Sequence, residues 1–323
     1  MNYLIEKAVV KYPLSICLGM CWVLISTGCS TVSSPDHREK LRVLPEWVVF
    51  QAKNGQAIDW NTMSKRALAS DIILVGEQHD NAIAHKLELK FVNELLTDYP
   101  NSAVAMEMFE RNEQAFIDLY LDDRISTEAL METTNSQSWG GSDGNWQNWY
   151  QPIIDAVKER VPSGARLVAA NSPRPYVKLA RLEGYGVLTE LASQDTEVYF
   201  VVPDISVDDN EYRERFNSLM TGHDHVDDSE VDSLKIDTDA YFRAQQLWDA
   251  TMAEAVLSAH KKHPKVVLFI GDFHIANSGG TLQRIIHDNQ ELSVTTISIL
   301  RKNDPQIFDP EDAARADFVI YTR

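Results

Sequence analysis

The sequence of 323 residues predicts an α/β fold, with a mostly parallel sheet flanked by helices and a smaller helical subdomain. Three observations lead to this prediction. Short apolar runs recur along the chain without strict alternation, as in strands that are covered on both faces. Helical patterns separate several of these runs, which is typical of strand–helix–strand units. Two longer stretches have helix-like sequence and no good candidate strand.

The candidate strands are short and mostly rich in β-branched residues. They lie at residues 47–50, 71–76, 102–108, 165–170, 265–271, 293–299 and 317–321. Between them, helical patterns cover 81–96, 152–160 and 281–289. In the first of these patterns the apolar residues form one stripe, as in a helix that packs on a sheet. Residues 110–150 and roughly 205–262 are the two helix-rich stretches, and we expect them to form the helical subdomain.

The N-terminus has the pattern of a bacterial export signal. Lys7 and Lys11 precede a short apolar stretch, and small residues lead to Cys29. The apolar stretch is too short to span a bilayer comfortably. The segment "STGC" is similar to a lipobox, with serine where an aliphatic residue is more usual. We expect residues 1–28 to be a lipoprotein signal peptide and Cys29 to carry the lipid; plain secretory cleavage is the alternative.

The remaining chain divides into a tether at 29–42 and a domain at 43–323. Cys29 is the only cysteine after the signal, so the domain has no disulfide framework and depends on its core. We expect a lipid-anchored protein of the bacterial cell envelope, in the outer membrane and facing the periplasm. The formal net charge of −18 argues against nucleic acid as a partner, because phosphate backbones select basic surfaces.

Ligand-capable side chains follow several of the candidate strands. Glu77 and His79 follow the strand at 71–76, Glu107 ends the strand at 102–108, and His274 follows 265–271. Open parallel sheets bind ligands outside the carboxyl ends of their strands. A single strand-end acid is usually a buried carboxylate with backbone partners. Because several strand ends share this feature, we expect a ligand site there.

Other candidate residues lie near these strand ends. His85, at the start of the helical pattern, faces either solvent or a site. Arg174, Tyr176 and Lys178 follow another strand, and the two cations could pair with ligand carboxylates; surface exposure is the plain alternative. A further group is aromatic and could form an apolar wall for a flat ligand. It comprises Trp139, Trp146, Trp149 and Tyr150.

Five segments together resemble one family. They are "LVGEQHDNAIAHKLELKFVNEL", "VAMEMFERNEQ", "WYQPIIDAVKE…ARLVAANSPRPYV", "QLWDATMAEAV" and "VVLFIGDFHIANSGGT". The sequence is similar to the ChaN-like haem-binding uptake lipoproteins, within the Tiki/erythromycin-esterase-like superfamily. The resemblance covers nearly the whole domain and implies an envelope lipoprotein that binds haem for haem or iron uptake.

The resemblance also implies a site. Haem is expected in a pocket shared by two copies of the chain, with a tyrosine as axial ligand and a histidine and a lysine near the propionates. Tyr150 is the first choice for the ligand and Tyr176 the second. Lys178 is the candidate lysine, and His79 or His85 is the candidate histidine. A phenolate oxygen suits ferric iron, and a nearby cation would help the phenol lose its proton.

An enzymatic function is the alternative. Relatives in the superfamily are hydrolases, and two histidines with two carboxylates form an acceptable ligand set for a divalent metal or an acid–base pair. The residues in this alternative are Glu77, His79, Glu107 and His274. We expect a haem-binding protein without enzymatic activity rather than a hydrolase.

Overall fold

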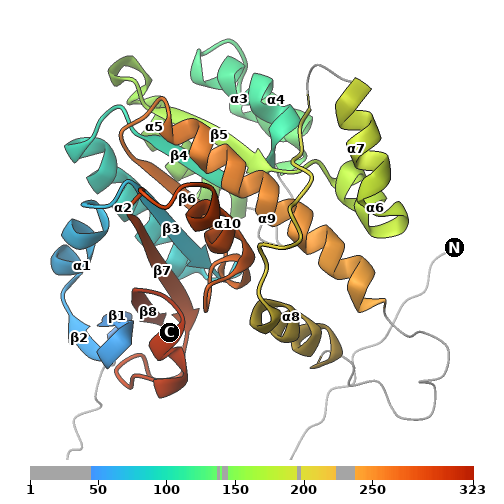
Figure 1. Cartoon of the computed structure of the whole chain (residues 1–323). Helices are drawn as coiled ribbons and strands as arrows, with labels where there is room; N and C mark the ends of the chain where they lie inside the picture. Colours follow the sequence, from blue (N-terminus) through green and yellow to red (C-terminus); the bar gives the residue numbers. More distant parts are fainter. Residues whose placement is uncertain (1–44, 137–138, 140–144, 195–197, 223–236) are drawn as a thin grey trace, which may run out of the picture. The chain divides into compact units, whose positions relative to one another are not determined.

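The computed structural model describes residues 45–136, 139, 145–194, 198–222 and 237–323 (Figure 1). The predicted signal peptide, Cys29 and the tether lie outside these residues and stay predictions. One compact unit comprises residues 43–323. Within the described part of the chain, no helix is both long enough and apolar enough to cross a membrane.

The core of the domain is a mixed sheet in the order β2-β1-β8-β7-β3-β6-β4-β5. Neighbouring strands from β8 to β5 are parallel, and β1 is antiparallel to both β8 and β2. The strands are β1 (Trp47–Gln51), β2 (Gln56–Ile58), β3 (Ile72–Glu77), β4 (Ala103–Glu110), β5 (Arg166–Asn171), β6 (Val266–Gly271), β7 (Val294–Arg301) and β8 (Phe318–Thr322). The predicted α/β fold is therefore confirmed.

Each candidate strand of the sequence corresponds to one of these strands, and only β2 was not predicted among those described. β2 has three residues, none of them buried, so it has no periodic signal. It pairs with β1 through a turn at Gly55, whose φ of 64° is readily adopted by glycine.

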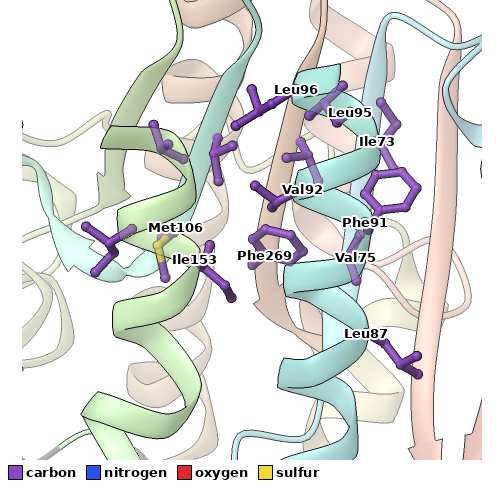
Figure 2. Packing of buried hydrophobic residues seen from close by; sticks show 14 of the residues in the cluster. Ile73, Val75, Leu87, Phe91, Val92, Leu95, Leu96, Met106, Ile153 and Phe269 are labelled. Atoms are coloured by element: carbon purple, nitrogen blue, oxygen red, sulfur yellow. The ribbon is translucent and has the colours of Figure 1, made fainter. Parts of the chain in front are cut away.

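Helices cover both faces of the sheet. The helices are α1 (Trp60–Ala67), α2 (Ala82–Asp98), α3 (Gln114–Leu121), α4 (Thr127–Thr134), α5 (Gln151–Lys158), α6 (Arg174–Glu183), α7 (Tyr185–Gln194), α8 (Asn210–Gly222), α9 (Thr238–His260) and α10 (Gly280–Asp288). On one face, α2 and α5 pack over alternate strand residues that include Ile73, Val75 and Phe269 (Figure 2). On the other face, α9 and α10 pack over the intervening residues, such as Ile72 and Leu74.

The two helix-rich stretches contain α3 and α4 in the first and α8 and α9 in the second. Met252 and Val256 of α9 belong to the same buried cluster as Ile72 and Leu74 of β3, so this half of α9 is a covering layer of the sheet. The subdomain boundaries stay a prediction.

Asn81, the N-cap residue just before α2, fixes the start of this helix. Asn81 accepts hydrogen bonds from the backbone N–H groups of Ile83 and Ala84, both at 3.2 Å, which satisfies two donors of the first turn. Its own amide nitrogen donates to the hydroxyl of Thr322 on β8, at 2.8 Å. This residue therefore ties the helix to the sheet just beyond the end of β3.

Candidate functional site

A pocket of about 270 Å³ opens where β3, β4, β5 and β6 end. Of the residues selected in the sequence, six line it: His79, Glu107, Trp139, Tyr150, Arg174 and His274. We call this the strand-end pocket. A larger groove of about 690 Å³ lies between α1 and α2, and none of the selected residues lines it.

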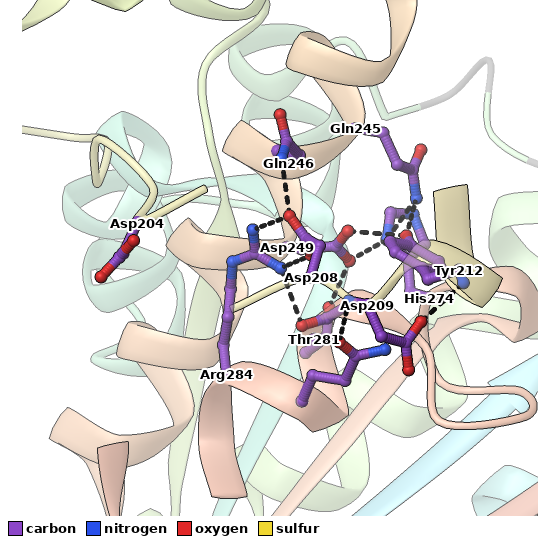
Figure 3. A network of polar contacts seen from close by, with 12 residues as sticks. Asp204, Asp208, Asp209, Tyr212, Gln245, Gln246, Asp249, His274, Thr281 and Arg284 are labelled. Atoms are coloured by element: carbon purple, nitrogen blue, oxygen red, sulfur yellow. Dashed lines mark hydrogen bonds and ion pairs between the residues drawn. The ribbon is translucent and has the colours of Figure 1, made fainter. Parts of the chain in front are cut away.

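His274 is held by a carboxylate of the neighbouring helix α9 (Figure 3). Its Nδ1 lies 2.7 Å from Oδ1 of Asp249; the same oxygen accepts a hydrogen bond from Thr281, and Oδ2 accepts one from Tyr212. Burial favours a neutral Asp249, but His274 and the other partners outweigh it and lower the pKa of this carboxyl. The N–H at Nδ1 of His274 therefore donates a hydrogen bond to the ionised Asp249, and Nε2 faces Oε1 of Glu107 at 3.6 Å.

The charge of His274 follows from these neighbours. Burial opposes a positive charge on the imidazole, but Asp249 and Glu107 outweigh burial and raise the pKa of His274. Glu107 is itself anchored, because its Oε2 accepts a hydrogen bond from the backbone N–H of Gly271 at the end of β6. The pocket thus has a histidine between two carboxylates on adjacent elements.

His79 is oriented by the last residue of β3. Its Nδ1 lies 2.7 Å from Oε1 of Glu77, whose side chain is fully buried, whereas 52% of the His79 side chain is exposed. The hydrogen bond to Glu77 raises the pKa of His79 to about 9, against the effect of burial. A Cβ on Gly271 would lie 3.3 Å from Nε2 of His79, so the glycine leaves room for the imidazole at the strand end.

Behind His79 lies a second polar group that is closed to solvent. Glu77, His85 and Glu88 all have fully buried side chains. Burial, followed by the charge of Glu88, raises the pKa of Glu77 to about 8, and burial raises the pKa of Glu88 to about 7. The sequence left open whether His85 faces solvent, and the structure places it in the interior, stacked on Trp149 at a ring distance of 4.7 Å.

Tyr150 lines the pocket although it is only 1% exposed. It ends a π-helical turn (Trp146–Tyr150) that leads directly into α5, and such turns often occur at functional sites. Burial, and then the carboxylates of Glu77, Glu88 and Glu107, raise the pKa of Tyr150. The charged groups that raise the pKa of Tyr150 are therefore carboxylates, whereas a cation beside the phenol would have lowered it.

The remaining predicted residues lie on α6. Arg174 lines the pocket at the first position of this helix, with its Nε 3.7 Å from Oε1 of Glu110. Lys178 is exposed one turn further along. Tyr176 packs on Phe200 with a ring distance of 4.6 Å and does not line the pocket. Of the two candidate tyrosines, only Tyr150 therefore lies in the pocket.

Sequence reasoning missed three carboxylates at the site. Glu110, the last residue of β4, lines the pocket. Glu88 had a usable signal, because a residue three positions after His85 lies on the same helical face. Asp249 had no local signal: it lies within the long helix α9, and its partner His274 is 25 residues away on a different element. Only the packing of α9 against the end of β6 brings this pair together.

Comparison with known proteins identifies the chain's relatives. Residues 63–285 match the model of a family described as haem-binding uptake, Tiki superfamily, ChaN. A solved structure titled as cofacial haem binding to ChaN of Campylobacter jejuni is 21% identical, with a TM-score of 0.57 over 86% of this chain and 97% of that chain. At this identity the likeness shows a shared fold.

Two more distant solved structures were also found. A mutant of the erythromycin esterase EreC in its open conformation is 12% identical, with a TM-score of 0.41 over 80% of this chain and 77% of that chain. The type III effector HopBA1 is 14% identical, with a TM-score of 0.39 over 81% of this chain and 92% of that chain. No curated protein matches the sequence.

Proposed function

Because the chain belongs to the ChaN family of haem-binding uptake proteins in the Tiki superfamily, we propose that it binds haem at the strand-end pocket and serves haem or iron uptake. The main support is that the matched residues, 63–285, include every residue that lines this pocket. The lining includes aromatic rings, two histidines and the cation of Arg174, and all of them lie within the part of the chain that the family model matches.

The size of the pocket determines how haem can lie in it. Its volume of about 270 Å³ is below the roughly 300–1,000 Å³ of sites that enclose a drug-sized ligand. A haem bound here lies across the mouth and keeps much of its apolar surface outside the chain. Covering that surface with a second copy removes it from water, so we propose a haem site shared by two chains.

Tyr150 is the axial ligand that we propose, with Tyr176 as the second choice. The pKa of Tyr150 is raised, so its phenol is protonated at neutral pH and coordination of ferric iron requires this proton to leave. Glu107 lines the same pocket, and we propose that its carboxylate accepts this proton. Arg174 lines the pocket and Lys178 follows one turn later, and we propose both for the haem propionates. His79, which lines the pocket, is the histidine that we propose beside them, because the alternative, His85, is buried behind it.

A haem titration of the chain tests this proposal. We expect saturable binding with a ferric tyrosinate-type spectrum, and Tyr150→Phe should weaken binding at least about ten-fold, equivalent to about 1.4 kcal/mol. Absorbance at increasing haem concentration measures both effects. Tyr241→Phe is the matched control, because it removes a hydroxyl from an exposed tyrosine of α9 outside the pocket.

Each other outcome has a defined meaning. Saturable binding that is unchanged in Tyr150→Phe would move the ligand to Tyr176 or to a histidine. An absence of saturable binding in the unmodified chain would reject the haem proposal.

A second candidate function is metal-dependent hydrolysis by Glu77, His79, Glu107 and His274. The Asp249–His274 pair favours it, because a buried carboxylate that fixes Nδ1–H leaves Nε2 facing the pocket, as in a general acid or base. Hydrolysis of ester or amide substrates that is lost in His274→Asn would support this function.

We also propose that lipid on Cys29 anchors the protein in the outer membrane, facing the periplasm. The support is the sequence pattern before Cys29. Labelling with radioactive palmitate that disappears in Cys29→Ser would support the anchor.

A further inference from the structure

The buried group behind the pocket has the geometry of metal ligands. Nδ1 of His85 lies 3.0 Å from Oε2 of Glu88 and 3.5 Å from Oε2 of Glu77. Ligand atoms of all three side chains lie within 4.8 Å of one another. Around a tetrahedral ion with bonds of about 2.1 Å, ligands lie about 3.4 Å apart. Two of the contacts therefore already have nearly the spacing that such an ion requires.

The proton on His85 is placed by the other side of its ring. Nε2 lies 3.1 Å from the backbone carbonyl oxygen of His79, and since a carbonyl only accepts, Nε2 carries the proton. In the neutral imidazole, Nδ1 then presents a lone pair to the two carboxylates. Lone pairs repel one another, so this arrangement requires a proton or a cation between them. A ligating histidine has the same arrangement, with its second nitrogen donating to a carbonyl or carboxylate.

The two carboxylates have polar atoms without partners. Among the described residues, Oε2 of Glu77 and Oε1 of Glu88 are buried and accept no hydrogen bond. Neither carboxylate forms an ion pair with a lysine or an arginine of the described chain. Burial disfavours the charged form of both carboxyl groups and raises their pKa values, and one divalent cation would balance the charge of the two carboxylates.

We propose that Glu77, His85 and Glu88 bind one divalent transition-metal ion in the interior, behind the strand-end pocket. One imidazole and two carboxylates suit Zn²⁺, Mn²⁺ or Fe²⁺, whereas Ca²⁺ and Mg²⁺ prefer oxygen ligands alone. The ion would join the end of β3 to the first turns of α2 and, through Glu77, orient His79. This site does not depend on haem binding, and it differs from the hydrolase alternative by using His85 and Glu88 instead of His79, Glu107 and His274.

The test is Zn²⁺ binding by the full-length, haem-free chain after removal of metal with a chelator. We expect one Zn²⁺ per chain by equilibrium dialysis and elemental analysis, and a rise in the melting temperature on adding Zn²⁺. Glu88→Gln keeps the size of the side chain but removes the anionic ligand, so it should weaken binding at least about ten-fold. Glu94→Gln, on the same helix, is the matched control and should bind Zn²⁺ as the unmodified chain does.

Two results would overturn the proposal. One is no stoichiometric Zn²⁺ binding, in which case the group would be held by shared protons. The other is Zn²⁺ binding that Glu88→Gln leaves unchanged; if His274→Asn then abolishes it, the ion lies in the strand-end pocket. If Glu88→Gln fails to fold, X-ray absorption of the Zn²⁺-loaded unmodified chain decides, because the proposal requires one imidazole and otherwise oxygen ligands.

Discussion

At the scale of single residues, burial changes what a carboxyl group does at neutral pH. Glu113 lies in a capping arrangement in which its Oε2 accepts from the backbone N–H of Glu110 at 2.7 Å. Burial, with a smaller contribution from the charge of Glu110, raises the pKa of Glu113 from 4.5 to about 7, although the hydrogen bond from the Glu110 backbone and the charge of Arg174 lower it. Between these pH values the folded chain keeps a proton that the unfolded chain has lost. This contribution to stability is complete below about pH 4.5 and is lost as pH rises through 7.

We therefore predict that Glu113→Gln makes stability less dependent on pH. The unmodified chain should lose on the order of 1 kcal/mol more than the variant between pH 5 and pH 8, because the glutamine cannot ionise. Urea unfolding at both pH values measures the difference. Glu128→Gln is the control, since this exposed carboxyl has a lowered pKa and is ionised in both states over this range. Equal losses in Glu113→Gln and the unmodified chain would contradict the prediction.

At the scale of elements, the position at which α2 begins determines where His79 and His85 lie. His79 precedes this helix and His85 lies in its first turns, so the position of the first turn sets both imidazoles. Asn81 fixes that turn by capping the helix and by donating to Thr322 of β8. The local sequence predicts a helix here, but the bond to β8 joins residues 241 positions apart.

Asn81→Ala should lower the free energy of unfolding by about 1–3 kcal/mol, because it removes the cap and the buried hydrogen bond to Thr322. Denaturant unfolding measures the loss, and haem titration should show weaker binding as well. The control is Asn93→Ala, which removes an exposed asparagine from the middle of the same helix and should change stability by less than about 0.5 kcal/mol. A loss of equal size in both variants would show that Asn81 has no special role.

At the scale of the whole molecule, the strand-end pocket is open and smaller than a site that encloses its ligand. The sheet and its two helical layers are closely packed, and the buried cluster on one face extends from β1 to β5. We therefore expect association of two folded chains around haem rather than a rearrangement within one chain.

Haem should convert the monomer into a dimer with one haem per chain, because each macrocycle leaves apolar surface that a second copy can cover. Sedimentation velocity with and without haem measures this change. Tyr150→Phe should show less dimer at the same haem concentration. A fully haem-loaded chain that sediments as a monomer would contradict the shared site, although not haem binding itself.

The sequence by itself determined the strands, the class of fold and most of the strand-end pocket. Buried strands such as 71–76 and 265–271 are continuous apolar runs, and parallel strands present their carboxyl ends at one edge. Glu77, His79, Glu107 and His274 could therefore be selected from their positions after strands. These signals are local, since each depends on a few neighbouring residues.

Only the tertiary structure decided the strand order, the burial of His85 and the partners of the site residues. In the sheet, β6 lies between β3 and β4, which places the end of β6 beside Glu107, 164 residues earlier in the chain. Asp249 reaches His274 because α9 packs on the sheet, and Glu88 faces Glu77 because α2 folds back over β3. Such contacts depend on how distant segments pack together, and a local pattern of residue types does not contain that information.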